Sequence, residues 1–533
     1  TRQNSQLVQP LIDNFFENEP YMEPQMELQL MQMLCSQINA DILNQVVGQL
    51  CPDQDIVVLY QAPEKEGVTH PTEGQLVEIL KNVKNADIKA NVEEAVNEPL
   101  ISANLKGSKV KKESEGIYGA AEWTLKNGLK VVVLPTQYKQ DQVIMKLDLE
   151  GGQTLIATED MPSFEENVWG LFQMNTGVSK FSASTLRKML AGKQVSVEPY
   201  IDVFNHGIQA VTTPKDLETA FQLAYLYFAD PRFDEAEYQT GIQQIVALLP
   251  NLMTNPDFLF QNELNKTIYD NNPRQIVLTA ETLEKANLAT IERVYRQLFK
   301  DVAGATLTVI GNVDIATLKP LVEKYMGSLP KGKKATEINE ANMINRAEGK
   351  VENIVRLDLA TPKSTVYQVY TAYMPVDTKT EVVLSAASYI LDMVYTKTLR
   401  EEEGGTYGAS SAMNARRIPN ERTSIMVAFD TNVEKSPKLR ELAIKGLKDI
   451  AENGPTQEQL TMAIENFKKN LPEQRINNSY WLSALEANKQ YGIDYDAEYE
   501  AALDAVTVED VKSVLQQILA SGNFMEIVLM PKN

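Results

Sequence analysis

A segment made of a short helix, a polar turn and a strand recurs three times in this chain, and this repeat constrains the architecture more than any other feature. The copies run from Asn39 to Pro63, from Asn287 to Gly311 and from Val506 to Pro531. In each copy, apolar residues at three- and four-residue steps predict the helix, and the runs DIVVL, TLTVI and MEIVL predict buried strands. The copies begin roughly 250 and 220 residues apart, which is the length of one domain. The chain is therefore expected to contain the end of a domain three times.

The start of such a domain is found only twice. Ala121 to Gln137 is predicted to be a hairpin that turns at Asn127-Gly128, and Ser364 to Pro375 is predicted to be the second opening strand. No similar segment precedes Asn39, so we expect the chain to begin inside a domain, as one piece of a longer repeat protein. The alternative is that generic helix–strand units resemble one another by chance.

The stretches between the repeats predict where the domains begin and end. Residues 1–96 are expected to be the C-terminal part of a preceding domain. Residues 97–119 are rich in Lys, Ser and Gly and show little periodicity, which is typical of a linker. Residues 120–335 and 336–533 are expected to be two complete domains, with a junction over Pro330 to Asn353.

Each complete domain mixes strands with long helices. Apolar residues recur at helical spacing over Lys215 to Phe228 and over Thr380 to Arg400, whereas Ser424 to Thr431 is predicted to be a strand. This mixture predicts the α+β class. We expect two complete homologous domains, each a largely antiparallel sheet covered on one face by helices, preceded by the tail of a third such domain.

The composition disfavours several classes of function. The chain has 51 Lys plus Arg against 72 Asp plus Glu, a formal net charge of −21, and no basic block. Because binding to nucleic acid depends on clustered positive charge, a nucleic-acid partner is disfavoured. No run of ~18 apolar residues predicts a membrane span. Cys35 and Cys51 have no metal-type spacing, and we interpret Cys35 as a structural thiol rather than a nucleophile.

The histidines argue against a metal centre or a histidine-based catalytic site in this chain. His70 and His206 are the two in the sequence, and we interpret both as loop residues. They cannot form HExxH or HxxEH, the paired-histidine motifs of zinc peptidases. The adjacent carboxylates Glu165 and Glu166 are interpreted as solvated residues at a helix end. We therefore predict no metal site and no cofactor in the chain itself.

One group of residues has the arrangement expected of a substrate-binding site. In LREEEGGTYG, Arg400 lies in the final turns of a predicted helix and Tyr407 is expected to start the next strand. Gly404 and Gly405 between them allow the positive φ of a helix stop. Arginine can hold a carbonyl or carboxylate with two hydrogen bonds, and tyrosine can donate to an oxygen that becomes negative during reaction. From spacing alone, the simpler interpretation is a basic residue near a helix C-terminus and an ordinary strand tyrosine.

Together with this turn, three further segments resemble the pitrilysin or insulinase-type zinc peptidases. They are Ala62 to Glu73 (APEKEGVTHPTE), Thr124 to Thr136 (TLKNGLKVVVLPT) and Val309 to Pro330 (VIGNVDIATLKPLVEKYMGSLP). The four segments occur in the family's order and span nearly all of the chain. The resemblance is greatest to bacterial members built as one chain of four homologous α+β domains. It implies that this chain is the C-terminal half of such a protein: the end of the second domain, a linker, an inactive third domain and a fourth domain.

The resemblance also implies where the catalytic zinc would lie. In this family the metal is held in the first domain by an HxxEH helix and a distal glutamate, and the corresponding segment here, Ser163 to Ser182, contains no histidine. Zinc is therefore expected in the full-length enzyme and not in this chain. Arg400 and Tyr407 have the spacing of the family's arginine–tyrosine pair, which implies that they contact backbone carbonyls of the bound peptide.

The resulting hypothesis is the non-catalytic C-terminal half of a zinc-dependent endopeptidase. Inactive alone, it would bind and position peptide substrates opposite the zinc site. The expected partner is the N-terminal half of the same peptidase, in the same chain or as a separate subunit. The alternative is a degenerate, non-proteolytic peptide-binding or scaffold subunit of the same family. The resemblance favours the periplasm or cell envelope, with the cytoplasm as the alternative.

Overall fold

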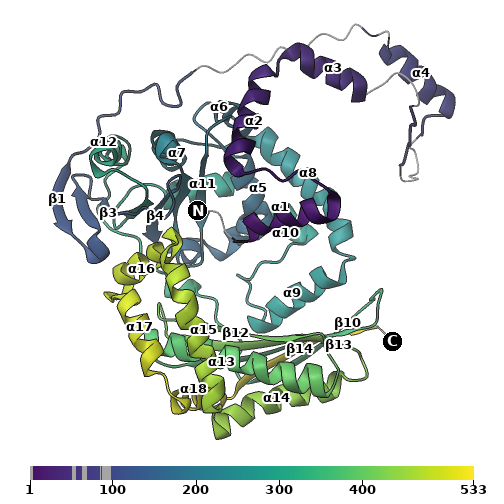
Figure 1. Ribbon diagram of the computed structural model, residues 1–533, viewed down its shortest axis with the longest axis vertical. Helices are drawn as coiled ribbons and strands as arrows, with labels where there is room; N and C mark the ends of the chain where they lie inside the picture. The colour runs from purple at the N-terminus through teal and green to yellow at the C-terminus, as the bar shows by residue number, and fades with distance from the viewer. Residues whose placement is uncertain (1–3, 51–55, 63–68, 85, 87–97, 533) are drawn as a thin grey trace. The chain divides into compact units, whose positions relative to one another are not determined.

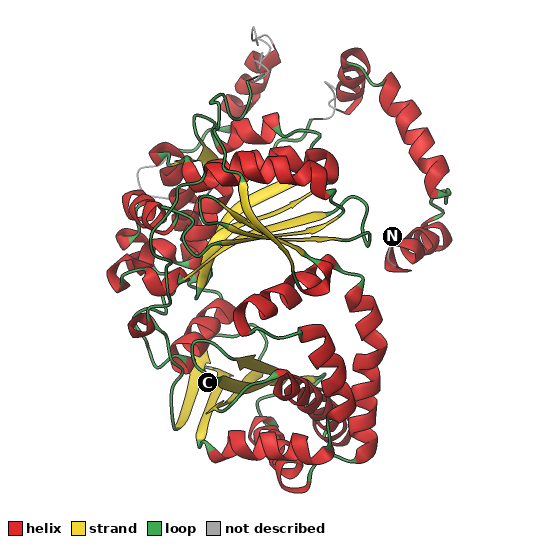
Figure 2. Cartoon of the chain, turned by 90° about the vertical axis from the view of Figure 1, so that its left-hand side faces the viewer, coloured by secondary structure: helices red, strands yellow, loops and turns green. Residues whose placement is uncertain are grey.

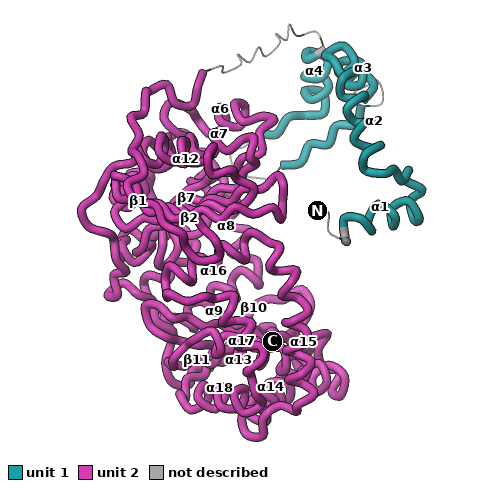
Figure 3. Tube along the Cα trace, turned by 60° about the vertical axis from the view of Figure 1, so that its left-hand side comes forward, with its two compact units in different colours: residues 1–94 teal, residues 95–533 magenta. Residues whose placement is uncertain are grey.

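The chain divides into two units of different construction (Figure 3). Unit 1 spans Thr1–Glu94 and unit 2 spans Ala95–Asn533. The computed structural model describes residues 4–50, 56–62, 69–84, 86 and 98–532. Where it is described, unit 1 has helices and irregular backbone, whereas unit 2 contains sheets packed against helices.

In its described residues, unit 1 has four helices: α1 (Asn4–Glu17), α2 (Pro24–Gln37), α3 (Ala40–Leu50) and α4 (Glu73–Lys84). α3 is the helix predicted for the first repeat. The strand predicted after it is not formed at residues 56–59, and Val57 is 92% exposed; Asp55 lies outside the described residues. A strand needs a neighbour to satisfy its backbone groups, and the described part of unit 1 offers none.

The first sheet of unit 2 has seven strands in the order β1-β2-β3-β9-β4-β7-β6. The strands are β1 (Val110–Glu115), β2 (Ala121–Leu125), β3 (Lys130–Pro135), β4 (Val143–Glu150), β6 (Val195–Ile201), β7 (Asn205–Thr212) and β9 (Thr306–Gly311). All neighbours are antiparallel except β3 and β9, which are parallel. β2 and β3 form the predicted hairpin, and Gly128 in its turn has a φ of +97°. A separate two-stranded pair joins β5 (Gly177–Val178) and β8 (Pro231–Arg232).

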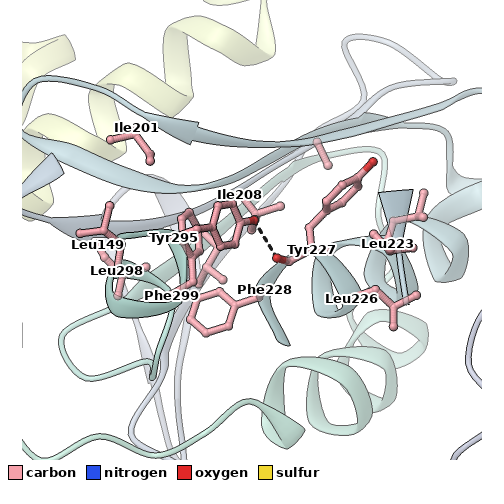
Figure 4. Packing of buried hydrophobic residues seen from close by; sticks show 14 of the residues in the cluster. Leu149, Ile201, Ile208, Leu223, Leu226, Tyr227, Phe228, Tyr295, Leu298 and Phe299 are labelled. Atoms are coloured by element: carbon pink, nitrogen blue, oxygen red, sulfur yellow. Dashed lines mark hydrogen bonds between the residues drawn. The ribbon is translucent and has the colours of Figure 1, made fainter. Parts of the chain in front are cut away.

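One face of the first sheet packs against helices from its own half of unit 2. The helices of this half are α5 (Glu166–Asn175), α6 (Ala183–Met189), α7 (Leu217–Ala229), α8 (Glu235–Leu252), α9 (Pro256–Ile268), α10 (Ala280–Lys285), α11 (Leu288–Leu298) and α12 (Ile315–Tyr325). In the core, Tyr295 is 1% exposed and stacks on Phe299, with ring centroids 4.2 Å apart (Figure 4). Its hydroxyl donates to the backbone oxygen of Tyr227 at 2.7 Å, so the buried phenol keeps a partner.

The second sheet has five strands in the order β10-β14-β11-β13-β12. They are β10 (Lys350–Leu357), β11 (Ser364–Tyr373), β12 (Ala409–Arg416), β13 (Arg422–Thr431) and β14 (Asn523–Pro531). The helices of this half are α13 (Thr378–Tyr395), α14 (Ser436–Asn453), α15 (Gln457–Arg475), α16 (Asn478–Tyr491), α17 (Tyr495–Ala505) and α18 (Val508–Ala520). α13, α14 and α18 lie on one side of this sheet (Figure 1), where alternate residues of β13, such as Ile425 and Val427, are buried against them. None of the described helices is long and apolar enough to cross a membrane.

The two sheets share one five-strand plan. The order β3-β9-β4-β7-β6 matches β10-β14-β11-β13-β12 in position along the chain, and each set has one parallel pair, at β3–β9 and β10–β14. In both sheets the strand that ends a repeat copy, β9 or β14, lies between the first strand of the set, β3 or β10, and the strand that follows it along the chain, β4 or β11. The predicted α+β class with largely antiparallel sheets is therefore confirmed.

Two strands occur where the composition predicts a linker or a junction. β1 lies within residues 97–119 and pairs with β2, while β10 begins at Lys350 and pairs with β14. Ser364–Tyr373 is therefore the equivalent of β4, and β10 is the opening strand. Both β1 and β10 are edge strands with many charged residues, VKKESE and KVENIVRL, so neither gives an apolar run in the sequence.

The other face of each sheet is partly covered by a helix from the opposite half of unit 2. From α9, Phe260, Leu264 and Ile268 pack on the second sheet, opposite α13 and α14. From α16, Leu485 packs on Leu134 and Ile310 of the first sheet. Figure 2 shows both sheets in yellow with helices against them. This exchange of α9 and α16 joins the two sheets into one unit.

Candidate functional site

Arg400 and Tyr407 lie between α13 and β12. Asp377 caps the start of α13, because its Oδ1 accepts from the backbone N of Thr380 at 2.7 Å. α13 does not continue to the glycines as a regular helix. After Tyr395 the backbone widens into a π-helical turn, Thr396–Glu402, and Arg400 belongs to this turn rather than to final α-helical turns. Such turns are often found at functional sites.

The two glycines of the turn are required for different reasons. Gly404 has a φ of +54°, as predicted for a helix stop. Gly405 has no positive φ, and the prediction for it was wrong. A Cβ at Gly405 would lie 2.6 Å from Cδ2 of the buried Leu439, so this position has no room for a side chain.

The turn is fixed by hydrogen bonds to residues that follow it in the chain. Lys435 Nζ donates to the backbone oxygens of Glu403 at 2.7 Å and Gly404 at 3.2 Å. Thr431 Oγ1 donates to the oxygen of Gly405 at 2.6 Å. These bonds satisfy carbonyls that would otherwise be unpaired at a helix end. The backbone that presents Arg400 and Tyr407 is therefore held in place.

Both candidate side chains point to solvent from this turn. Tyr407 is 99% exposed and lies in a bend, not in the strand, which begins two residues later at Ala409. Arg400 is also exposed. In the part of the chain that the structure describes, neither side chain has a hydrogen bond or an ion pair. A phenol ring usually buries most of its area, so an exposed and unpartnered one on a fixed turn is available to a ligand.

The segment that would correspond to a metal-binding helix holds no metal ligand set. It forms α5, and Glu165 is its N-cap: its carboxylate accepts from the backbone N of Asn167 at 2.9 Å and of Val168 at 3.2 Å. Glu165 is 6% exposed rather than solvated as predicted, and burial raises the pKa of its carboxyl group. Among the described residues no group of three His, Cys, Asp or Glu could hold a metal ion.

His206 is a buried strand residue, and its prediction as a loop residue was wrong. It lies in β7 with 0% exposure. Its Nδ1 accepts from the backbone N of Gly152 at 3.3 Å, so Nε2 carries the proton and donates to the oxygen of Leu298 at 3.1 Å. Burial lowers the pKa of His206 to about 4. The imidazole is therefore a neutral structural group.

Sequence reasoning proposes Arg400 and Tyr407 as the candidate pair but gives no indication of the residues that fix their turn. Lys435 and Thr431 lie on the far side of the β12–β13 hairpin, and no local pattern connects them with the glycines. Their role follows from the pairing of β12 with β13, which brings the end of β13 beside the start of β12.

Comparisons with known proteins agree with this architecture. The family model described as the peptidase M16 inactive domain matches residues 285–467. A zinc protease PQQL-like protein of Arabidopsis thaliana is 22% identical over 99% of this chain and 56% of its own length. The probable zinc protease PqqL of Escherichia coli K12 is 21% identical over the same shares. The chain thus spans about half the length of these curated relatives.

The fold also matches a solved structure along the whole chain. The crystal structure of the periplasmic protease PqqL from Escherichia coli aligns with a TM-score of 0.71 and 20% identity, over 100% of this chain and 59% of that one. The matching segments, the shared five-strand plan and the family model point the same way. These findings support the pitrilysin/insulinase-type (M16) peptidases as the family that this chain resembles.

Proposed function

We propose that this chain is the substrate-positioning part of a zinc-dependent endopeptidase whose metal site lies in the rest of the protein. The observation that carries the proposal is the pair Arg400 and Tyr407, exposed and unpartnered on a turn fixed by Lys435 and Thr431. Relatives that match the chain over about half their length are named zinc proteases. The described residues here offer no metal site of their own.

The two side chains have complementary roles toward a bound peptide. The hydroxyl of Tyr407 donates to the carbonyl oxygen of the bond being cleaved, which becomes negative as the tetrahedral intermediate forms. The guanidinium of Arg400 donates to a neighbouring backbone carbonyl and fixes the position of the peptide. In the complete protein, a zinc ion and a glutamate base held by residues outside this chain would activate the water that attacks the peptide bond.

The apolar surface of unit 1 supports a further protein partner. Phe15 is 79% exposed, Phe16 76% and Leu50 76%. Exposed apolar surface of this kind marks a protein contact. The partner is the N-terminal half of the same peptidase, in one chain or as a separate subunit. Since one structural relative is named a periplasmic protease, we place the assembled protein in the periplasm.

The test uses the assembled peptidase, formed by this chain together with the N-terminal half. This chain alone should not cleave a fluorogenic peptide, and the assembly should. Tyr407→Phe removes the donor and nothing else, so kcat should fall by at least about tenfold with little change in KM. Arg400→Ala should lower kcat/KM by at least about tenfold, partly through a higher KM.

Matched variants separate this effect from general damage. Arg296→Ala removes an exposed arginine paired with Glu292 on α11, and Tyr225→Phe removes a half-buried phenol; both should leave kcat and KM unchanged. If the assemblies that carry Arg400→Ala and Tyr407→Phe were fully active, the two residues would not be part of the substrate site.

The alternative is a non-proteolytic, peptide-binding or scaffold protein of the same family. The observation in its favour is the description of the matching model as an inactive domain. The two functions differ in the metal content of the complete protein. About one zinc per assembled protein supports the peptidase, whereas a zinc-free protein that still binds peptides supports the scaffold.

A further inference from the structure

Three arginines gather where the two halves of unit 2 adjoin. Arg416 and Arg422 are directly opposite each other in the register of β12 and β13. They lie on the face of the sheet that also carries Met426 and meets α9, not on the face covered by α13. Arg346 precedes β10 in a segment that runs along α9 on the same face, since the backbone N of the next residue, Ala347, donates to the oxygen of Ile268 at 2.8 Å. Three segments thus bring three cations together.

In the part of the chain that the structure describes, the cluster has no acidic partner, although Nη2 of Arg416 donates to Oδ1 of Asn420. Across the described ranges, no ion pair joins any of the three to Asp or Glu. Nη1 of Arg422 and the Nε atoms of Arg346 and Arg416 are buried without a hydrogen-bond partner, and Arg422 is only 9% exposed. The neighbouring Arg417 differs, because its Nε lies 3.0 Å from the carboxylate of Glu381.

Such an arrangement is costly for a protein with nothing bound to it. Like charges directly opposite each other on two strands destabilise the pairing, and buried donors without acceptors lose their hydration. Burial, together with the charge of Arg422, lowers the pKa of Arg346. The same two causes lower the pKa of Arg416 to about 10. An anion would remove both costs at once.

An aromatic ring lies against the guanidinium group of Arg416. The guanidinium carbon of Arg416 lies 5.1 Å from the ring centroid of Phe204, which belongs to the turn between β6 and β7. Tyr373 is opposite Arg422 in the register of β11 and β13. Nη2 of Arg416 donates to Oδ1 of Asn420, whereas its Nη1 has no hydrogen bond to a described residue and can donate to a carboxylate.

We propose that Arg346, Arg416 and Arg422 form an oxyanion site that binds a carboxylate group of an acidic peptide. The peptide assignment rests on the proposed function and on the position of the site along β12. Tyr407 precedes the first residue of this strand and Arg416 is the last. At about 3.3 Å per residue, β12 separates its two ends by roughly 23 Å, the span of about seven residues of extended peptide.

The site therefore selects substrates with negative charge at a distance from the bond being cleaved. A peptide that reaches both ends of β12 would place its reacting carbonyl near Tyr407 and an Asp, a Glu or its C-terminal carboxylate at the arginines. Free phosphate has the same oxyanion chemistry, so the binding test includes it as a separate probe.

Binding is measured by titration calorimetry on the 533-residue chain at low ionic strength, which requires no catalysis and no partner. The probes are an acetylated tri-glutamate peptide, an acetylated and amidated tri-glutamine peptide, and inorganic phosphate. The tri-glutamate should bind and the tri-glutamine should not. Arg422→Gln and Arg416→Gln should each weaken the binding of tri-glutamate by at least about tenfold, since each removes a charge-assisted contact.

Arg296→Gln on the exposed surface of α11 makes the same change in net charge and should leave the affinity unaltered. Without ligand, Arg416→Gln should raise the thermal midpoint, because it relieves repulsion; this also reports that the variant folds. Arg346→Gln tests the same site from another segment of the chain and should also weaken the binding of tri-glutamate.

Equal binding of tri-glutamate by the wild-type chain and by both Arg422→Gln and Arg416→Gln would overturn the site. Binding of phosphate without tri-glutamate would overturn the peptide assignment. Because cleavage is not measured, neither result depends on the role of Arg400 and Tyr407.

Discussion

At the scale of single residues, the two glycines in the turn between Arg400 and Tyr407 and the glycine that follows Tyr407 have different constraints. Gly404 has a positive φ and open space around its Cα, Gly405 has an ordinary φ but faces Leu439, and Gly408 has neither constraint. Gly404→Ala should therefore destabilise the fold by about 1–2 kcal/mol through backbone strain. Gly405→Ala should cost about 1–3 kcal/mol through overpacking against Leu439.

Gly408→Ala is the matched control for these two substitutions. It should be neutral, or stabilising by up to about 1 kcal/mol, because alanine restricts the unfolded chain without straining the native one. The free energies come from urea unfolding of the three variants beside the wild-type chain. If Gly405→Ala were as stable as Gly408→Ala, the contact with Leu439 would not define the turn.

The buried His206 predicts a dependence of stability on pH. Burial lowers its pKa to about 4, from about 6.5 in the unfolded chain. Between these values the unfolded state binds more protons than the native state, so stability falls as the pH is lowered from 6.5 to 4. The contribution of His206 is about 3 kcal/mol over that range.

His206→Gln removes this titration. The glutamine amide can still donate to the oxygen of Leu298, so the variant is expected to fold at lower stability. The measurement is the free energy of unfolding in urea at several pH values from 4 to 7. The difference between the wild-type chain and His206→Gln should shrink by about 3 kcal/mol as the pH falls to 4. A constant difference would mean that the histidine is charged inside the fold.

At the scale of elements, the helices of the repeats and the central strands of the sheets could be predicted from the sequence. α11, α18, β9 and β14 all follow from their apolar spacing, because each is buried against its own domain. The edge strands β1 and β10 could not, since an edge that faces water needs no apolar run. The strand after α3 was predicted from its apolar residues but lacks a neighbour within the described residues.

The candidate site, too, could be predicted only in its local features. The glycine pair and the spacing from Arg400 to Tyr407 are local features, so the sequence indicates them. The π-helical turn and the hydrogen bonds from Lys435 depend on how β13 returns beside β12, which is a long-range pairing. The cluster of Arg346, Arg416 and Arg422 is missed for the same reason, since it needs the register of the hairpin and the path of the chain before β10.

At the scale of the whole molecule, the exchanged helices make the two sheets of unit 2 depend on each other. Leu264 of α9 is 3% exposed, and α9 packs on the second sheet although it belongs to the first half. Leu485 of α16 is 6% exposed and packs on the first sheet although it belongs to the second half. Asn478 strengthens the second contact, because it donates to Gln142 at 2.9 Å and accepts from Thr136 at 2.6 Å.

A cavity in either exchanged helix should therefore loosen the opposite half of unit 2. Leu264→Ala and Leu485→Ala should each cost about 2–5 kcal/mol of stability. In hydrogen exchange followed by mass spectrometry, Leu264→Ala should speed exchange in β14, and Leu485→Ala should speed it in β3 and β9. Leu248→Ala on α8, where the leucine is 58% exposed, is the control and should change exchange only locally. If each cavity loosened only the half that contains it, the two sheets would be independent domains, and Arg346 could not be held firmly beside the arginines of β12 and β13.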